Sequence, residues 1–279
     1  MSARAAVSAR DALDGARTAI AAGGSSSARL DAELLLADVL GVSREHLVRE
    51  PTLPVAGDAV RRYQSHVRRR AIDREPVAYI LGRRAFRHVD LLVDPSVLVP
   101  RPETELLVEV GLELPAGARV LDCCTGSGAV ALALKHERPD LVVTGSDISE
   151  AALGVARANA ARLGLEVEWL IGDLLAGLDG SWDAVLANPP YVPTAVLCTL
   201  EPEVSRHEPM LALDGGPDGL EVVRRLVTEA AARQTIALAL EIGEGQADAV
   251  AALSRAAGYR SVAQRVDLAG IARVVVARW

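Results

Sequence analysis

The fold is decided by the ten residues Arg119-Val120-Leu121-Asp122-Cys123-Cys124-Thr125-Gly126-Ser127-Gly128. The first part of this stretch is an apolar run typical of a buried strand, and the last four residues form a tight glycine turn. Residues 129–137 then have the composition of a helix. A strand, a glycine-rich loop and a helix in this order bring the backbone close to a nucleotide-like ligand.

The acidic residue before this loop indicates the charge of the ligand. Dinucleotide-binding folds use a similar loop, but with a G-x-G-x-x-G spacing that this chain does not have. An anionic Asp122 favours a cationic ligand over a pyrophosphate. S-adenosylmethionine carries a sulfonium and an ammonium group and fits that preference. The residues that we expect to bind it here are Asp122, Cys124, Thr125, Gly126, Ser127 and Gly128.

Two further acids follow the next two expected strands. Residues 141–146 lead into Asp147, which can accept both ribose hydroxyls of a nucleoside. Alternatively, Asp147 or Ser149 begins the following alanine-rich helix as its N-cap, and both roles can coexist. Asp173 follows the expected strand 168–172 and can accept from an adenine amine, with Leu174 packed on the ring. A simple turn residue is an equally good interpretation of Asp173.

A proline pair ends the expected strand 182–187 in the tetrapeptide Asn188-Pro189-Pro190-Tyr191. Neither proline has an N–H for a strand ladder, so the strand must open into a rigid, exposed turn. The turn presents an amide, a carbonyl and an aromatic ring together, which suits a planar –NH2 group such as a carboxamide or a base amine. The alternative is a proline-rich turn that only ends the strand.

The alternation of strands and helices predicts a parallel sheet with helices on both faces. Ligands of such sheets lie outside the carboxyl ends of the strands. The glycine loop, Asp147, Asp173 and Asn188 all follow strands, so we expect them at this one edge.

Other motifs complete a resemblance to a known family over nearly the full length. They are SARLDAELLL at 27–36, REPVAYILG at 74–82, VPRPETE at 99–105 and EPMLALDGGPDGL at 208–220. Together with the glycine loop and NPPY, they make the chain similar to the class I S-adenosylmethionine-dependent methyltransferases. More narrowly, it resembles the PrmC/HemK family of peptide-chain-release-factor N5-glutamine methyltransferases. It departs from the family pattern at Leu174, where an aromatic residue is common, and at the polar segment 87–90.

The resemblance implies a reaction at the glutamine of a Gly-Gly-Gln motif in release factors. Asn188 Oδ1 and the Pro189 carbonyl would each accept one N–H of the substrate amide and align its nitrogen lone pair. Tyr191 would pack on the amide plane, and Pro190 would keep the turn rigid. Arg101 is a further candidate for substrate binding. No dedicated base is required, because the proton can leave to water after methyl transfer.

The expected fold class is α/β, with a seven-stranded class I methyltransferase (Rossmann-like) domain preceded by a small all-helical domain. We expect a helical substrate-docking domain at 1–75, an extended or hairpin linker at 76–100 and the methyltransferase domain at 101–279. A helix expected over 58–74 carries Arg61, Arg62, Arg68, Arg69 and Arg70. These arginines form either a docking surface for a protein partner or a solvated helix face.

Charge and composition bound the remaining choices. The first 100 residues hold 15 basic and 12 acidic side chains, whereas the others hold 15 and 25. The excess of acidic side chains after residue 100, in the expected catalytic part, disfavours direct nucleic-acid binding. Three cysteines without metal spacing predict buried structural thiols and no metal site. An apolar leader and an 18-residue apolar run are both missing, so we expect a cytoplasmic protein that does not bind membranes.

Two alternatives remain open from the sequence. One is the same chemistry on a ribosomal-protein glutamine or on the amine of a nucleic-acid base. The other is a binding module that holds the cofactor without turnover, which the intact Asp122, Asp147 and NPPY disfavour.

Overall fold

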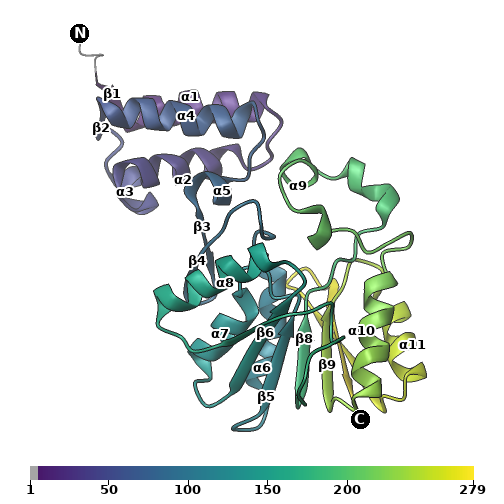
Figure 1. Ribbon diagram of the computed structural model, residues 1–279. Helices are drawn as coiled ribbons and strands as arrows, with labels where there is room; N and C mark the ends of the chain where they lie inside the picture. The colour runs from purple at the N-terminus through teal and green to yellow at the C-terminus, as the bar shows by residue number, and fades with distance from the viewer. Residues whose placement is uncertain (1–5) are drawn as a thin grey trace. The chain divides into compact units, whose positions relative to one another are not determined.

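The computed structural model describes residues 6–279, which form two compact units (Figure 1). We call the first the helical unit; it contains the chain up to Gly82 together with residues 201–207. The second, the sheet unit, contains residues 83–200 and 208–279. The expected domain boundaries at residues 75 and 100 stay a prediction. In the structure, the boundary between the two compact units falls after Gly82.

The helical unit is a small bundle with one short pair of strands. Its helices are α1 (Ala9–Ala22), α2 (Ala28–Leu40), α3 (Arg44–Arg49), α4 (Asp58–Ala71), α5 (Val77–Leu81) and α9 (Pro202–Ser205). The two-residue strands β1 (Val7–Ser8) and β2 (Pro54–Val55) pair in antiparallel fashion and were not expected from the sequence. The bundle core includes Ile20, Leu35, Leu36 and Tyr63, whose hydroxyl donates to the Ala32 carbonyl at 3.1 Å.

Local signals set the ends of these helices. The Ser8 side chain accepts from the Asp11 N–H and caps α1. Helix α2 ends, as the sequence predicts, where Gly41 adopts a left-handed φ of 66°. Helix α4 ends at Ala71 rather than at the predicted Arg74, which has a φ of 56° and has left the helix.

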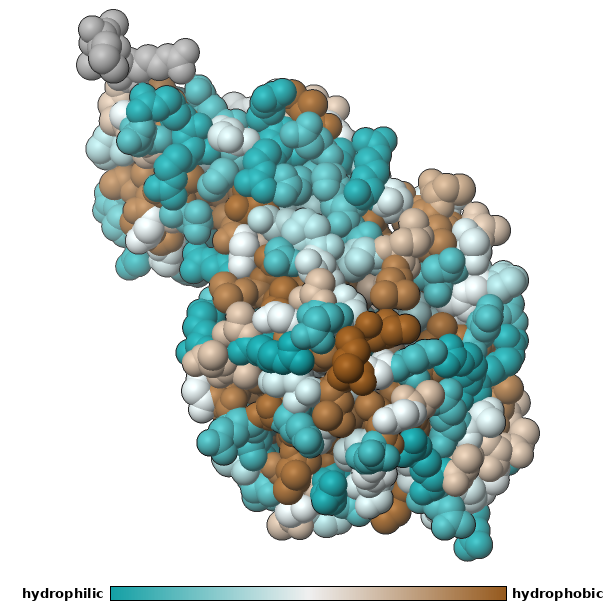
Figure 2. All heavy atoms as spheres, in the orientation of Figure 1, coloured by the Kyte–Doolittle hydropathy of each residue, from teal (hydrophilic) through white to brown (hydrophobic). Residues whose placement is uncertain are grey.

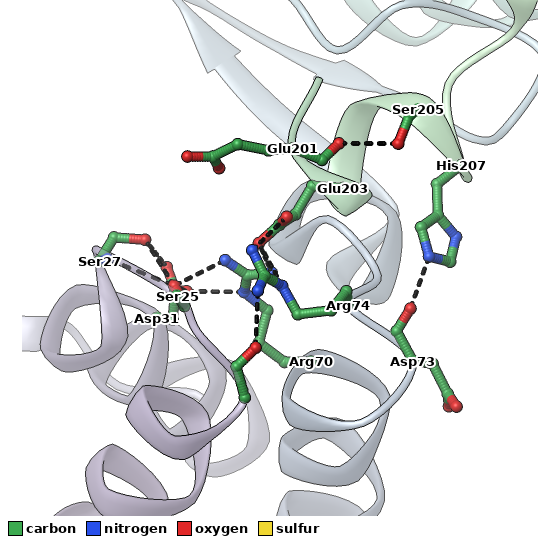
Figure 3. A network of polar contacts seen from close by, with 11 residues as sticks. Ser25, Ser27, Asp31, Arg70, Asp73, Arg74, Glu201, Glu203, Ser205 and His207 are labelled. Atoms are coloured by element: carbon green, nitrogen blue, oxygen red, sulfur yellow. Dashed lines mark hydrogen bonds and ion pairs between the residues drawn. The ribbon is translucent and has the colours of Figure 1, made fainter. Parts of the chain in front are cut away.

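A buried ion-pair network explains why α4 ends early (Figure 3). Arg74 donates to both carboxylate oxygens of Glu203 on α9, from Nε at 2.9 Å and from Nη2 at 2.6 Å. Arg70 donates to the same Glu203 and, from Nε at 2.7 Å, to Asp31 on α2. Arg70 is only 5% exposed, so the prediction of a surface position is wrong for this arginine.

The sheet unit contains the remaining elements. Before the sheet come the hairpin β3 (Arg83–Phe86) and β4 (Val89–Leu92), the turn η1 (Pro102–Thr104) and helix α6 (Glu105–Leu112). The sheet strands are β5 (Arg119–Cys123), β6 (Val142–Asp147), β7 (Glu168–Ile171), β8 (Ala184–Ala187), β9 (Ala237–Glu241), β10 (Ser261–Val266) and β11 (Ala272–Arg278). The other helices and turns are α7 (Ala129–Glu137), α8 (Glu150–Leu163), η2 (Thr194–Thr199), η3 (Met210–Ala212), α10 (Glu221–Ala232) and α11 (Ala247–Ala256).

The seven sheet strands lie in the order β10-β11-β9-β8-β5-β6-β7. Strands β5 to β9 are parallel, and β11 is antiparallel to both neighbours. The chain thus inserts its last strand between β9 and β10, as the family resemblance implies. The order reverses at β5 and β8, which lie side by side, and ligands of α/β sheets bind at such a reversal.

Alternate residues of each strand pack against opposite layers of helices. Leu121, Val185 and Leu238 are cross-strand neighbours in one core, which α10 and α11 cover. The next row, with Leu186 and Ala239, belongs to the other core, which α6 and α7 cover (Figure 1). This period of two makes a three-layer α/β domain.

Candidate active site

One cavity of about 540 Å3 opens within the sheet unit at the carboxyl ends of its parallel strands. Its size suits a small-molecule or cofactor site. The predicted residues that line it are Asp122, Cys124, Thr125, Gly126, Ser127, Asp147, Asp173, Leu174, Asn188 and Pro190. The predicted residues that do not line it are Arg101, Gly128, Pro189 and Tyr191.

Asp122 organises the glycine loop. Its Oδ2 accepts from the Thr125 hydroxyl at 2.5 Å and from the Ala131 N–H at 3.0 Å. The side chain lies in the strand row that faces α7, so it is only 2% exposed. Burial raises the pKa of Asp122 to about 7. The Asp122 carboxyl therefore mainly stabilises the glycine loop. It attracts a cationic ligand less strongly than we expected from the sequence.

The loop turns sharply because three alternate residues, Cys124, Gly126 and Gly128, all have positive φ values. Cys124 is not a glycine and carries backbone strain at a φ of 62°. A side chain on Gly126 would meet no atom within 4 Å, so the backbone is open at this point of the cavity. A Cβ at Gly128 would lie 2.9 Å from the Trp169 ring, so this glycine serves packing.

Asp147 joins the tip of β6 to the glycine loop. Its Oδ2 accepts from the Gly126 N–H and its Oδ1 from the Ser149 N–H, both at 2.9 Å. Burial raises the pKa of this carboxyl above its ordinary value. The N-cap of α8 is Ser149, whose hydroxyl accepts from the Ala152 N–H at 3.2 Å. Asp147 is thus held at the cavity and is not itself the helix cap.

Asp173 and Leu174 form the far wall of the cavity. Asp173 Oδ2 accepts from Arg225 Nη2 at 2.8 Å, and both residues line the cavity. Arg225 comes from α10 and was not among the site residues expected from the sequence. Leu174 is buried and has a left-handed φ of 55°, so an aliphatic side chain stands where the family often has an aromatic one.

The NPPY turn follows β8 and places Asn188 at the cavity. Asn188 Nδ2 donates to the Thr104 hydroxyl at 3.2 Å. With its nitrogen used in this bond, the amide keeps Oδ1 as an acceptor for another group. Thr104 belongs to the PRPETE segment and is buried, and it was not among the site residues expected from the sequence.

Tyr191 is anchored beside the cavity rather than in it. Its hydroxyl donates to Glu241 Oε1 at 3.4 Å, and its carbonyl accepts from Gln246 Nε2 at 3.0 Å. Burial raises its pKa well above the ordinary range of a tyrosine. The predicted stacking of this ring on a substrate amide stays a prediction.

The LDGGPDGL segment at 213–220 packs on the NPPY turn. This close contact explains why two of the segment's residues are glycines. A Cβ at Gly215 would lie 2.8 Å from the Pro190 carbonyl oxygen, and one at Gly219 would lie 2.4 Å from the Tyr191 carbonyl oxygen. Only glycine permits this close backbone approach. The turn is therefore held from two sides, by Thr104 and by residues 215–219.

Arg101 does not line the cavity, but it binds Glu208, which is close in sequence to residues that do. Its Nη2 donates to both oxygens of Glu208, at 2.8 and 2.7 Å. Glu208 precedes Met210 and Leu211, which line the cavity and are 50% and 58% exposed. Figure 2 shows a group of hydrophobic side chains near the middle of the visible face of this unit. The expected contact of Arg101 with substrate stays a prediction.

Several absences complete the description of residues 6–279. Within this range no cluster of His, Cys, Asp and Glu could hold a metal ion. In the same range no helix has both the length and the apolar character needed to cross a membrane. Of the three cysteines, Cys123 is buried, Cys124 is half-buried and Cys198 is exposed, so the expectation of a buried thiol is wrong for Cys198.

The strand order, the cavity at its reversal and the glycine loop define a class I methyltransferase fold. A methyltransferase from Pyrococcus furiosus shares this fold with a TM-score of 0.53 at 19% identity, over 68% of this chain and 88% of that one. Residues 102–199 match the methyltransferase small domain, and residues 11–82 match the PrmC N-terminal domain.

Full-length relatives define the family. The release factor glutamine methyltransferase of Deinococcus radiodurans is 43% identical over 96% of this chain and 98% of the relative. The protein of the same name from Moorella thermoacetica is 45% identical over 96% of this chain and 97% of the relative. The chain belongs to the release factor glutamine methyltransferase family, and the class and cofactor expected from the sequence are confirmed.

Proposed function

We propose that this protein transfers a methyl group from S-adenosylmethionine to the side-chain amide nitrogen of the glutamine in the Gly-Gly-Gln motif of a release factor. One observation carries the proposal. The glycine loop, Asp147 and Asn188 line one cavity, so an acceptor amide at Asn188 lies beside a cofactor at the loop. Membership of the family supports the choice of glutamine in a release factor.

The residues of the cavity fit the cofactor. Gly126 offers open backbone without a side chain, and Asp147 offers a carboxylate that two backbone N–H groups already orient. We assign Asp147 to the ribose hydroxyls, and Leu174 with Asp173 to the adenine. Arg225 reduces the acceptor strength of Asp173, so Leu174 carries more of the adenine contact than the acid. Cys124, Thr125, Ser127 and Gly128 shape the loop around these groups.

The NPPY turn performs the acceptor half of the reaction. A primary amide nitrogen is a poor nucleophile because its lone pair is delocalised into the carbonyl. When bound, S-adenosylmethionine supplies an electrophilic methyl group on a good leaving group. Asn188 Oδ1 and the Pro189 carbonyl each accept one substrate N–H, which orients the nitrogen and stabilises the positive charge that develops on it. Pro190 and the packed glycines 215 and 219 keep both acceptors rigid.

The acceptor glutamine must be exposed, since a residue within a packed helix or strand cannot enter a concave site. We therefore propose that the substrate glutamine lies on a flexible loop of the release factor and that the helical unit holds the body of the same partner. We further propose that nucleic acids and membranes are not partners and that the enzyme works in the cytoplasm.

Parallel labelling assays test this function. Purified protein and radiolabelled S-adenosylmethionine are incubated separately with a release factor, with ribosomal proteins and with DNA. A release factor whose Gly-Gly-Gln glutamine is replaced by leucine is the matched control. We expect label only on the intact release factor, and mass spectrometry should place it on that glutamine. Label on the leucine variant, on ribosomal protein or on DNA would overturn the proposed substrate.

A further inference from the structure

Asn159 on α8 is a buried side chain to which the site described so far gives no role. It is 0% exposed and does not line the cavity. Its carboxamide bonds to the main chain of two segments, 67 and 32 residues earlier in the chain. Oδ1 accepts from the Leu92 N–H at 2.6 Å, and Nδ2 donates to the carbonyls of Leu92 and Ser127, each at 3.0 Å.

These three bonds permit only one orientation of the Asn159 amide. The Leu92 N–H can only donate, so it requires the amide oxygen, whereas both carbonyls require the two hydrogens of Nδ2. A flipped amide would set its nitrogen against an N–H and its oxygen against two carbonyl oxygens. Asn159 therefore pairs with Leu92 as a residue of a further strand would, and it has one hydrogen left for Ser127.

The bond to Ser127 acts on the glycine loop. Ser127 lines the cavity. The Ala131 N–H, four residues further on, donates to Asp122 Oδ2 at 3.0 Å, so it leaves the Ser127 carbonyl to Asn159. Asp122 thus holds an N–H and Asn159 holds a carbonyl of the same junction between the glycine loop and α7.

The bonds to Leu92 act on a second part of the cavity lining. Four residues after Leu92, the chain enters the cavity wall with Ser96, Val97 and Leu98. A closed turn connects them to β4. The Asp94 side chain accepts from the Ser96 N–H at 2.8 Å, and the Asp94 carbonyl accepts from the Val97 N–H at 3.1 Å. A displacement of Leu92 would therefore be passed on to these lining residues.

We propose that Asn159 is a positioning residue of the cofactor site. Its amide joins the glycine loop at Ser127 to the wall segment that follows Leu92, and so fixes the spacing of two parts of the cavity lining. Both parts are ordered before a ligand arrives, which lowers the entropic cost of binding S-adenosylmethionine. The inference rests on the proposed placement of the cofactor in this cavity, and Asn159 touches neither cofactor nor substrate in this role.

A second carboxamide offers a matched comparison at the NPPY turn. Gln246 Oε1 accepts from the Gly243 N–H at 2.8 Å. Its Nε2 donates to the carbonyls of Tyr191 and Gly219, at 3.0 and 3.3 Å. Gln246 thus makes the same set of one accepted and two donated main-chain bonds, and it also lies outside the cavity lining.

Three substitutions separate positioning of the cofactor site from general packing. Asn159→Leu keeps the approximate volume of the side chain and removes all three bonds, and Gln246→Met does the same at the comparison position. Asn159→Asp keeps an oxygen for the Leu92 N–H. When this carboxyl is ionised, its other oxygen faces two carbonyl oxygens, and when it is protonated it regains one donor.

We expect Asn159→Leu to raise the Kd for S-adenosylmethionine at least about tenfold, because three buried main-chain groups lose their partner. Calorimetry without any methyl acceptor measures this Kd, and Gln246→Met should change it by less than about twofold. In methylation assays, Asn159→Leu should raise KM for the cofactor, while kcat at saturating cofactor stays within about threefold. Relative to wild type, Asn159→Asp should bind the cofactor more tightly at pH 6 than at pH 8, because protonation restores a donor.

Each outcome has one meaning. If Asp147→Ala weakens cofactor binding and Asn159→Leu does not, the positioning role alone is wrong. If neither does, the cofactor does not bind in this cavity, and the inference falls together with the proposed site. Equal losses of affinity for Asn159→Leu and Gln246→Met would also overturn the role of Asn159, as would an unchanged relative affinity of Asn159→Asp between the two pH values. Should Asn159→Leu fail to fold, Asn159→Asp at these pH values decides.

Discussion

At the scale of single residues, the site depends on carboxyls that are held by the protein's own backbone. Asp147 receives two backbone N–H bonds before any ligand arrives, and Asp122 receives one along with a hydroxyl. Such carboxyls are preorganised, so little ordering remains to be done when a cofactor binds. Three predictions belong to this scale.

The first prediction concerns Asp147 and the cofactor. Asp147→Ala should weaken S-adenosylmethionine binding at least tenfold, or about 1.4 kcal/mol, because charge-assisted bonds to the ribose are lost. Asp140→Ala is the control, since Asp140 precedes the opposite end of β6 and bonds to the Gly117 N–H. Calorimetry that finds equal affinities for both variants would leave Asp147 as a support of the loop only.

The second prediction concerns Asn188 and the acceptor. Asn188→Ala should lower methyl transfer at least about 100-fold, the usual scale for losing a preorganised transition-state contact. Cofactor affinity should fall much less, because the glycine loop and Asp147 remain. Single-turnover labelling together with calorimetry measures the two effects, and near-normal turnover would argue against the amide clamp.

The third prediction is a pH dependence of stability that originates at Asp122. Its folded pKa is raised to about 7, whereas an unfolded aspartate has a pKa of about 3.9. Between these values the folded state binds more protons than the unfolded state, so this group makes stability fall as pH rises. Asp122→Asn keeps both hydrogen bonds and removes this proton. The Tm of the variant relative to wild type should therefore rise from pH 5 to pH 8, and a constant difference in thermal melts would refute the assignment.

At the scale of elements, the four-residue helix α9 is held by charge rather than by an apolar face. Glu203 accepts from Arg70 and Arg74, and His207 Nε2 is hydrogen-bonded to the Asp73 carbonyl at 2.8 Å (Figure 3). Arginine pairs bury both charges together, so removing one partner leaves the other buried and unpaired.

The fourth prediction tests this network. Arg70→Met should lower the free energy of unfolding of the helical unit by about 3 kcal/mol, because Asp31 loses its buried guanidinium. Arg68→Met, an exposed position on the same helix, is the control and should change it by less than about 0.5 kcal/mol. Urea unfolding followed by circular dichroism measures both, and equal effects would mean that the network adds nothing.

The elements also show how far sequence reasoning reaches. The strand, loop and helix around Gly126, the α7 bounds and the strand-end positions of Asp147 and Asn188 were predicted correctly, because periodicity and turn residues are local signals. The partners of Arg70, Arg101 and Thr104 were not predicted. Arg70 and Glu203 are 133 residues apart, and Arg101 and Glu208 are 107 apart. A local pattern contains no information on which distant charge completes a pair.

At the scale of the whole molecule, recognition of a protein substrate requires a surface beyond the active-site cavity. The buried Arg70 and the ion-paired Arg69, whose Nη2 lies 2.5 Å from Glu75 Oε1, are not available for such a surface. Arg61, Arg62 and Arg68 remain exposed on α4, although Arg61 is paired there with the exposed Asp58. The docking role of this face, and the expected docking domain at 1–75, stay predictions.

The fifth prediction tests that face. Reversing the charge at Arg61 and Arg68, which are seven residues apart on one side of α4, should raise KM for an intact release factor, and more so at low salt. Activity on a short Gly-Gly-Gln peptide should not change, because the peptide lacks the body of the release factor that this face is proposed to bind. Equal losses on protein and peptide would indicate a disturbed fold, and no loss on either would indicate a merely solvated face.

The inclusion of residues 201–207 in the helical unit has a consequence for biosynthesis. A ribosome adds about 5–20 residues per second, so the 133 residues between Arg70 and Glu203 take roughly 7 to 27 s to make. During that interval the first helices have emerged and Arg70 can already pair with Asp31, but the guanidinium of Arg74 still lacks its counterion. The nascent bundle must therefore stay loose or hydrated at this point, and its final closure waits for a short stretch of chain from the far side of the catalytic sequence.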